Sequence, residues 1–295
     1  MSSLIEQATL RLQQLRLAGV KLPDMPAPPV VPRPSAPQKP PVQSQRVELD
    51  LDALAAANIV TPSAPRSLVA DQFRVIKRPL ISNALGKGSA SSTHANLIMV
   101  TSAVAGEGKS FTSVNLAISI AAELDHTVML VDADVARPSL PRMLGVPEGP
   151  GLLDLLDGAA GMADVLLKTN IDKLTLLRSG TPHDRATEML ASEAMRQLLD
   201  DMSSRYADRI IIFDSPPLLL TTEARALAAN MGQIVVVVQA GKTLQANVQR
   251  ALATIEACPL KLMVLNQTRA DAQDASDLGY GYGYGYRYGS AKHGA

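Results

Sequence analysis

The segment AVAGEGKS, which begins at Ala103, carries the residue types needed to hold a row of phosphate groups. It matches the pattern G-x-x-x-x-G-K-[ST] except at Ala103, and it lies between a strand-like and a helix-like stretch, as this pattern requires. Gly106 and Gly108 let backbone N–H groups wrap a phosphate at a helix N-terminus, where the dipole favours anions. Lys109 supplies a positive charge for the β and γ phosphates, and Ser110 can present its hydroxyl to Mg²⁺. The pattern favours a site for ATP and Mg²⁺ over a chance glycine turn.

Carboxylates follow two further apolar stretches. The stretch VMLVDADVARP contains Asp132, Asp134 and Arg137, and IIIFDSPPLL contains Asp214. An aspartate after a buried strand, facing a phosphate loop, is the Walker B arrangement that holds Mg²⁺ directly or through water. The alternative is that these aspartates only cap helices or turns, which is more plausible for Asp132 and Asp134 than for Asp214.

Short apolar strands alternate with helix-like stretches beyond residue 96. The expected strands span residues 96–101, 127–132, 174–177, 209–214, 233–238 and 261–266, and the expected helices lie within 108–124, 184–204, 221–230 and 243–256. Near-continuous apolar runs such as IVVVV indicate strands buried on both faces, which is typical of a parallel sheet covered by helices. The predicted fold class is therefore α/β, with a mostly parallel sheet flanked by helices.

The composition limits the classes of partner and of cellular site that the chain can have. The 295 residues include 28 Lys and Arg against 28 Asp and Glu, so the formal net charge is zero and nothing favours nucleic acid or an anionic membrane. The single cysteine, Cys258, permits no internal disulfide, and the four histidines lack metal-ligand spacing. No apolar run reaches the roughly 18 residues that span a bilayer. We expect a cytoplasmic protein with no membrane span of its own.

The chain divides into four predicted parts. Residues 1–21 form a short amphipathic helix, and residues 22–46 are a linker rich in proline, which removes backbone donors and favours extended structure. Residues 47–276 form the phosphate-binding domain, whose first long helix is expected from Ser67 to Lys77, ended by Pro79. Residues 277–295 are a flexible Gly/Tyr-rich tail. The tail's five tyrosines alternate with other residues, mostly glycine: Tyr280, Tyr282, Tyr284, Tyr286 and Tyr288.

The phosphate loop, the D-x-D strand end and the D-S-P-P sequence together resemble the bacterial tyrosine kinases, or BY-kinases, of the polysaccharide copolymerase system. That family has a P-loop NTPase fold, and its C-terminal tyrosine cluster is the autophosphorylation substrate. The N-terminal layout looks like the subgroup associated with exosortase and exopolysaccharide loci. The resemblance, which covers roughly residues 67–288, implies an ATP-dependent protein-tyrosine autokinase that regulates exopolysaccharide synthesis or export.

The resemblance also implies roles for single residues. Asp132 would orient or deprotonate the incoming tyrosine hydroxyl, and Lys109, Asp134 and Asp214 complete the catalytic set. Ser110, Asp134 and Asp214 would hold Mg²⁺. The expected nucleotide-binding residues are Ala105, Gly106, Glu107, Gly108, Lys109, Ser110, Phe111 and Asn266, the last of which would face the purine or be a turn residue.

Assembly is implied in the same way. The family's E-x-x-R-x-x-R association motif corresponds to Asp71, Arg74 and Lys77, so only the central Arg is kept and the charge signs are preserved. We expect a homo-oligomer, activated by a separate membrane-embedded polysaccharide copolymerase that recruits it to the inner membrane.

The alternative function is that of a P-loop ATPase of the partition or septum-site type, acting as a scaffold or positioning switch. Those proteins have a similar D-x-D strand, but their phosphate loop carries a signature Lys where this chain has Val104. They also lack a tyrosine tail. Two features therefore favour the kinase.

Overall fold

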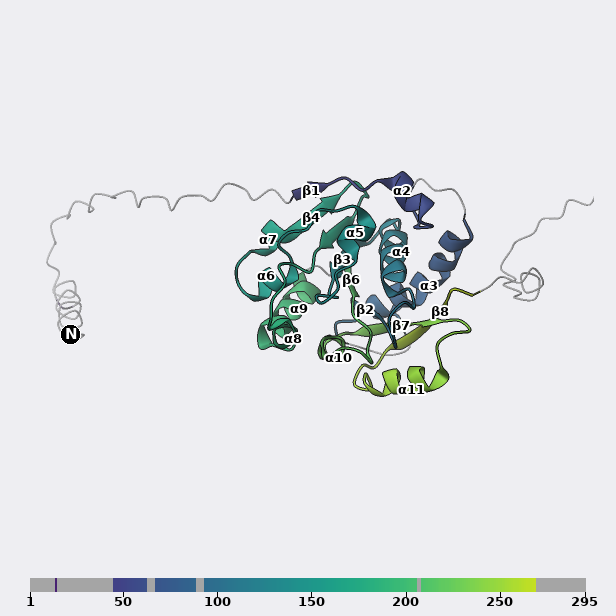
Figure 1. Ribbon diagram of the computed structural model, residues 1–295. Helices are drawn as coiled ribbons and strands as arrows, with labels where there is room; N and C mark the ends of the chain where they lie inside the picture. Colours follow the sequence, from purple (N-terminus) through teal and green to yellow (C-terminus); the bar gives the residue numbers. More distant parts are fainter. Residues whose placement is uncertain (1–13, 15–44, 63–66, 89–92, 206–207, 269–295) are drawn as a thin grey trace, which may run out of the picture. The chain divides into compact units, whose positions relative to one another are not determined.

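The computed structural model describes residues 14, 45–62, 67–88, 93–205 and 208–268. Its centre is an eight-stranded sheet in the order β1-β4-β5-β3-β6-β2-β7-β8, in which only β4 and β5 pair antiparallel (Figure 1). The strands are β1 (Gln45–Val47), β2 (Leu97–Ser102), β3 (Thr127–Asp132), β4 (Leu166–Thr169), β5 (Leu174–Leu177), β6 (Arg209–Asp214), β7 (Gln233–Gln239) and β8 (Lys261–Asn266).

Helices cover both faces of the sheet, as the apolar strands predict. Figure 1 shows α3 and α4 beside one face, while α6, α8 and α9 lie beside the other. The helices are α2 (Leu51–Ala56), α3 (Leu68–Ala84), α4 (Lys109–Ala121), α5 (Leu140–Leu144), α6 (Leu152–Leu156), α7 (Met162–Val165), α8 (Ala186–Leu190), α9 (Glu193–Arg205), α10 (Thr222–Ala228) and α11 (Gln245–Ala253).

The two faces of the sheet build two cores. Alternate residues of one strand point to opposite faces, so Leu97 and Met99 join the core under α6 to α11, whereas Ile98 and Val100 join the core under α2 to α5. All four side chains are fully buried. The central strands are thus held from both sides, and their carboxyl ends are fixed in place.

The six predicted strands are present, but the sheet is larger than expected. The strands β1 and β4 were not predicted, and β1 begins at Gln45, ahead of the expected domain start at residue 47. Both are very short, and β4 follows the end of α7 with no intervening loop residue. Two of the three residues of β1 are polar, and β4 runs on directly from α7, so neither strand forms a separate apolar run that the sequence pattern could reveal.

The prediction that Pro79 ends the first long helix is wrong, because α3 continues through Pro79 to Ala84. The amide of Gln233, at the start of β7, donates to the Leu80 carbonyl oxygen at 3.0 Å and accepts from the Asn83 amide at 2.9 Å. Leu80 is completely buried. Tertiary contacts beyond the proline therefore outweigh the lost helix hydrogen bond.

The helical stretch expected at 184–204 is two helices, α8 and α9. Ser192 lies between them and its hydroxyl accepts from the Met195 N–H at 3.2 Å, which caps the new helix. The short helices α5, α6 and α7 were not predicted.

All of the predicted N-terminal helix except residue 14, nearly all of the Pro-rich linker and the whole tyrosine tail lie outside the described residues. Within the described part of the chain, no helix combines the length and apolar character needed to cross a bilayer.

Candidate nucleotide and catalytic site

The phosphate loop joins β2 to α4, as predicted. Gly106 and Gly108 have φ angles of 85° and 94°, a left-handed conformation that favours glycine. A Cβ on Gly108 would also lie 2.0 Å from the side-chain nitrogen of Asn266, so the Asn266 amide would have to move to make room for it. Ala103 is fully buried, which shows that the first position of the motif packs into the core.

The two reactive side chains of the loop already have partners on the segment that follows β3. The Lys109 Nζ lies 3.0 Å from the Asp134 Oδ2. The Ser110 and Ser139 hydroxyl oxygens are 2.8 Å apart. Both contacts join the phosphate loop to the residues between β3 and α5.

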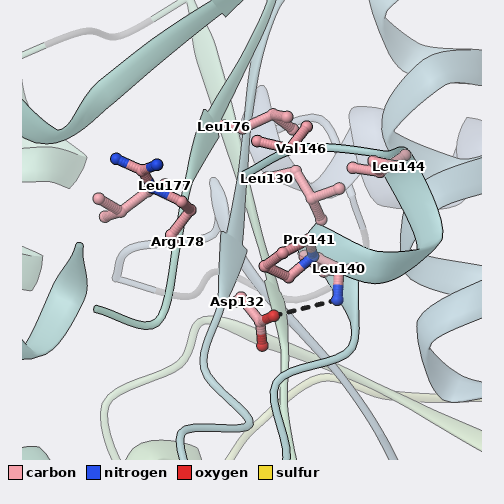
Figure 2. Close-up of a pocket in the computed structure, with 9 residues that line it drawn as sticks. All are labelled: Leu130, Asp132, Leu140, Pro141, Leu144, Val146, Leu176, Leu177 and Arg178. Carbon is pink, nitrogen blue, oxygen red and sulfur yellow. Dashed lines mark hydrogen bonds between the residues drawn. The ribbon is translucent and has the colours of Figure 1, made fainter. Parts of the chain in front are cut away.

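Asp132 and Asp214 end the adjacent strands β3 and β6 and are paired in register. Asp132 accepts from the Leu140 N–H at 3.1 Å, the contact drawn in Figure 2, and from the Asp134 N–H at 3.3 Å. Figure 2 also shows apolar side chains, such as Leu130 and Pro141, beside Asp132. The structure therefore brings the predicted carboxylates together.

Burial changes the acidity of both carboxyls. Desolvation, reinforced by the negative charge of Asp214, raises the pKa of Asp132 to about 8. Desolvation also raises the pKa of Asp214, to about 6, although the nearby positive charge of Lys109 opposes the shift. Without a ligand, then, this corner of the protein favours a protonated Asp132.

Asp214 has an unfilled interaction. Its Oδ1 lies 3.0 Å from the Ser113 hydroxyl, and the nearby Ser110 hydroxyl also acts to lower its pKa, but its buried Oδ2 has no partner with normal hydrogen-bond geometry. An unpaired buried carboxylate oxygen is costly unless a ligand completes it. Hard oxygen donors suit Mg²⁺, which usually takes few protein ligands and completes its shell with phosphates and waters. The residues thus fit Mg²⁺, although the described residues contain no group of three or more His, Cys, Asp or Glu side chains arranged around a metal.

Three predicted nucleotide-binding residues have side chains engaged elsewhere. Glu107 is buried and faces the segment after β7, as its contact with Thr243 shows. Asn266 donates to the backbone carbonyl of Glu107 at 2.9 Å, so it supports the phosphate loop from β8. Phe111 packs edge-on against Phe73 of α3, with ring centroids 6.4 Å apart. Their side chains hold the loop, while the exposed Ala105 lies on its surface.

An open hollow of about 590 Å³ lies at the carboxyl ends of β7 and β8. It is lined by Gln239, Ala240, Gly241, Lys242 and Gln267. The Gln267 side chain reaches the Gly106 carbonyl oxygen at 3.4 Å, so the hollow borders the phosphate loop.

The three residues of the expected association motif lie on α3 but do not share a role. Asp71 and Arg74 form an exposed ion pair. Lys77 is buried; its Nζ donates to the Ser119 carbonyl oxygen at 2.6 Å and lies 2.6 Å from a Glu123 carboxylate oxygen. The expectation that Lys77 serves subunit contacts is therefore revised, because its side chain joins α3 to α4 within the subunit.

Three functional candidates were missed from the sequence: Ser113, Ser139 and Thr243. Ser113 lies one helical turn after Lys109, so the i, i+4 spacing on α4 could have indicated it. Ser139 and Thr243 reach the loop only through the fold, and the sequence carried no signal for them.

The model of the ParA family, described as NUBPL iron-transfer P-loop NTPases, matches residues 93–267. This chain belongs to that family. The P-loop NTPase is 29% identical over 223 residues to the tyrosine-protein kinase YwqD of Bacillus subtilis (strain 168). This match covers 76% of this chain and 90% of YwqD. It is 31% identical over 172 residues to the tyrosine-protein kinase ptk of Acinetobacter johnsonii. This second match covers 58% of this chain but only 23% of the longer ptk.

Two solved structures also resemble this P-loop NTPase in fold and sequence. The VpsO kinase domain superposes with a TM-score of 0.58 at 25% identity, covering 68% of this chain and 97% of that domain. The chimerical protein CapA2B2 gives 0.61 at 26% identity, covering 77% and 94%. The predicted α/β P-loop fold and the resemblance to the bacterial tyrosine kinases are confirmed. The exosortase-associated subgroup stays a prediction.

Proposed function

We propose that this P-loop NTPase is an ATP-dependent protein-tyrosine kinase that phosphorylates its own C-terminal tyrosine cluster and so regulates exopolysaccharide synthesis or export. One observation carries the proposal: Lys109, Ser110, Asp132, Asp134 and Asp214 converge at the carboxyl ends of β2, β3 and β6, in a chain whose relatives are named tyrosine-protein kinases. The partition-type ATPase is the less favoured alternative.

The side chains of the phosphate loop change partners when nucleotide binds. Lys109, now paired with Asp134, would hold the β and γ phosphates, and Ser110, now paired with Ser139, would hold Mg²⁺. Asp134 and the unpaired oxygen of Asp214 would be the other Mg²⁺ ligands. When bound, Mg²⁺ neutralises the negative charge that develops on the phosphates during transfer.

Asp132 receives the hydrogen bond of the incoming tyrosine hydroxyl. An ordinary aspartate, with a pKa near 3.9, is a weak base toward a tyrosine hydroxyl near 10. The buried Asp132, whose pKa is raised to about 8, is better matched to that proton. Only the ionised form of Asp132, a minority at neutral pH without a ligand, can both orient the hydroxyl and take up its proton as the bond to phosphorus forms.

The hollow beside the phosphate loop takes the nucleoside of ATP. It opens at the ends of β7 and β8, and the Gln267 amide links it to the loop backbone. Its polar lining, with Gln239 and Lys242, can donate hydrogen bonds to a ribose or a base.

Assembly and partners follow from the resemblance. The exposed Asp71 and Arg74 form the remaining part of the association surface on α3 of a homo-oligomer. In the longer relative ptk, the matched segment is 23% of the chain and is joined to further sequence. We propose that a separate membrane-embedded copolymerase supplies an activating contact here and recruits the kinase to the cytoplasmic side of the inner membrane.

The proposal is tested by incubating the full chain with Mg·ATP and mapping phosphotyrosine by mass spectrometry. We expect phosphate on residues 280–288, and none in a variant with all five tail tyrosines replaced by Phe. Each phosphotyrosine adds about −1.5 to −2 charges, so light scattering should show wild-type oligomers loosening while the Phe variant stays assembled. ATP hydrolysis without phosphotyrosine, or equal dissociation of both proteins, would favour the positioning ATPase.

A further inference from the structure

Glu107 places a negative charge in a loop that binds phosphate, where that charge would repel the ligand. The residue is nevertheless buried, with a relative exposure of 1%. One carboxylate oxygen, Oε2, accepts from the Val104 N–H at 2.7 Å. This contact closes the phosphate loop on itself across three residues.

The other oxygen, Oε1, faces a different part of the chain. It accepts from the Gln239 N–H, at the end of β7, at 3.3 Å and from the Thr243 hydroxyl, which lies between β7 and α11. The carboxylate thus has donors on both oxygens. Because those donors take up its charge and hold it away from the open side of the loop, the repulsion of phosphate is reduced.

Thr243 is fixed by more than this one contact. Its N–H donates to the Gln239 carbonyl oxygen at 3.1 Å, and its hydroxyl accepts from the Gln239 N–H at 3.3 Å. These bonds form a compact turn just after β7. A segment about 136 residues away in sequence is therefore attached to the phosphate loop through a single side chain.

We propose that Glu107 is a positioning residue that holds the phosphate loop in its nucleotide-binding shape, and that Thr243 acts through it. The inference rests on nucleotide binding by the loop, and not on tyrosine phosphorylation. With the Thr243 hydroxyl removed, Oε1 keeps only the longer bond from Gln239, and a methyl group faces a buried charge. The loop then reaches its binding shape in a smaller fraction of molecules, which weakens nucleotide affinity by that fraction.

The test measures equilibrium binding of a fluorescent ADP analogue and the KM and kcat of ATP turnover. We expect Thr243→Val to bind the analogue about 10-fold more weakly, because a hydrogen bond to a charged group is lost, and to raise KM more than it lowers kcat. Thr243→Ser, which keeps the hydroxyl, should bind within about 2-fold of wild type. Glu107→Gln, which places an NH₂ group against N–H or O–H donors, should weaken binding by more than Thr243→Val.

The chain offers a matched control in Thr187, whose hydroxyl donates to the Glu223 carboxylate at 2.7 Å on the helices α8 and α10. Thr187→Val removes the same kind of bond away from the loop and should leave nucleotide affinity unchanged. Unaltered binding in both Thr243→Val and Glu107→Gln would overturn the proposal, as would equal weakening in Thr187→Val. Absence of phosphotyrosine with this binding pattern intact would count against the kinase function alone.

Discussion

The carboxyl edge of the sheet has two halves that differ in how completely their polar groups are paired. At the ends of β2, β3 and β6, Lys109 and Asp134 hold each other and Asp214 has an oxygen without a partner. At the ends of β7 and β8, the Asn266 amide and the Thr243 hydroxyl make hydrogen bonds to Glu107. The first half can exchange partners when a ligand arrives, whereas the second keeps the loop in place.

The difference has an energetic reason. A buried oxygen without a donor costs roughly 1–3 kcal/mol, and a ligand that supplies the missing partner recovers that free energy. Glu107, whose two carboxylate oxygens already have donors within the fold, recovers no such free energy on binding, so it contributes shape. The division predicts that substitutions in the first half change chemistry and charge, and that those in the second change affinity.

The largest effect is expected for Lys109→Met, which removes the positive charge from the first half. Tail phosphotyrosine should fall by at least about 100-fold, because charge stabilisation of the phosphates is lost. Circular dichroism should be unchanged. Wild-type phosphotyrosine in this variant would show that the loop is not the catalytic phosphate site.

Asp132→Asn tests whether the buried Asp132 carboxyl of the first half makes the free energy of unfolding depend on pH. With a pKa of about 8 when folded and near 3.9 when unfolded, Asp132 holds a proton in the folded state that the unfolded chain releases. The free energy of unfolding of the ligand-free protein should therefore fall as pH rises from 4 to 8, on the order of 3 to 5 kcal/mol from this group.

Urea unfolding at pH 4, 6 and 8 measures this dependence. Asp132→Asn should flatten it and be the more stable protein at pH 8, while phosphorylation is lost. An identical pH dependence in the variant and the wild type would mean that Asp132 is not the buried acid that titrates.

Asn266→Ala addresses the second half, since it removes the amide that supports the loop from β8. The loss of one hydrogen bond should lower the free energy of unfolding by about 1 kcal/mol and weaken nucleotide binding roughly 3- to 10-fold. Titration calorimetry with ADP measures the affinity. If kcat fell and affinity did not, Asn266 would belong with the first half, at the ends of β2, β3 and β6.

Ser139→Ala should have the smallest effect. It frees the Ser110 hydroxyl from its partner at 2.8 Å, so binding of Mg·ADP should tighten about 2-fold while ADP in EDTA binds as before. Equal changes with and without Mg²⁺ would show that the contact does not restrain the metal ligand.

The central fold was predictable from local pattern. Runs such as Ile210–Phe213 and Ile234–Val238 are apolar throughout, as strands buried on both faces are, and they form β6 and β7. The helix end at Pro79 was not predictable, because its cost is local while the contacts of Leu80 and Asn83 with Gln233 come from a strand about 150 residues later. The strands β1 and β4 are defined only by their pairing with each other and with β5.

At the site, the sequence by itself determined which groups could do chemistry. Backbone geometry sets the spacing of Gly106, Gly108 and Lys109 in the phosphate loop. The aspartates at strand ends lie together because parallel strands align at their carboxyl ends. Only the tertiary structure decided that Glu107 turns away from the ligand toward Thr243 and that Lys77 lies inside the subunit. A side chain's direction depends on which donors and acceptors the fold brings within reach, and Thr243, Ser119 and Glu123 lie tens of residues or more along the chain from the side chains that they contact.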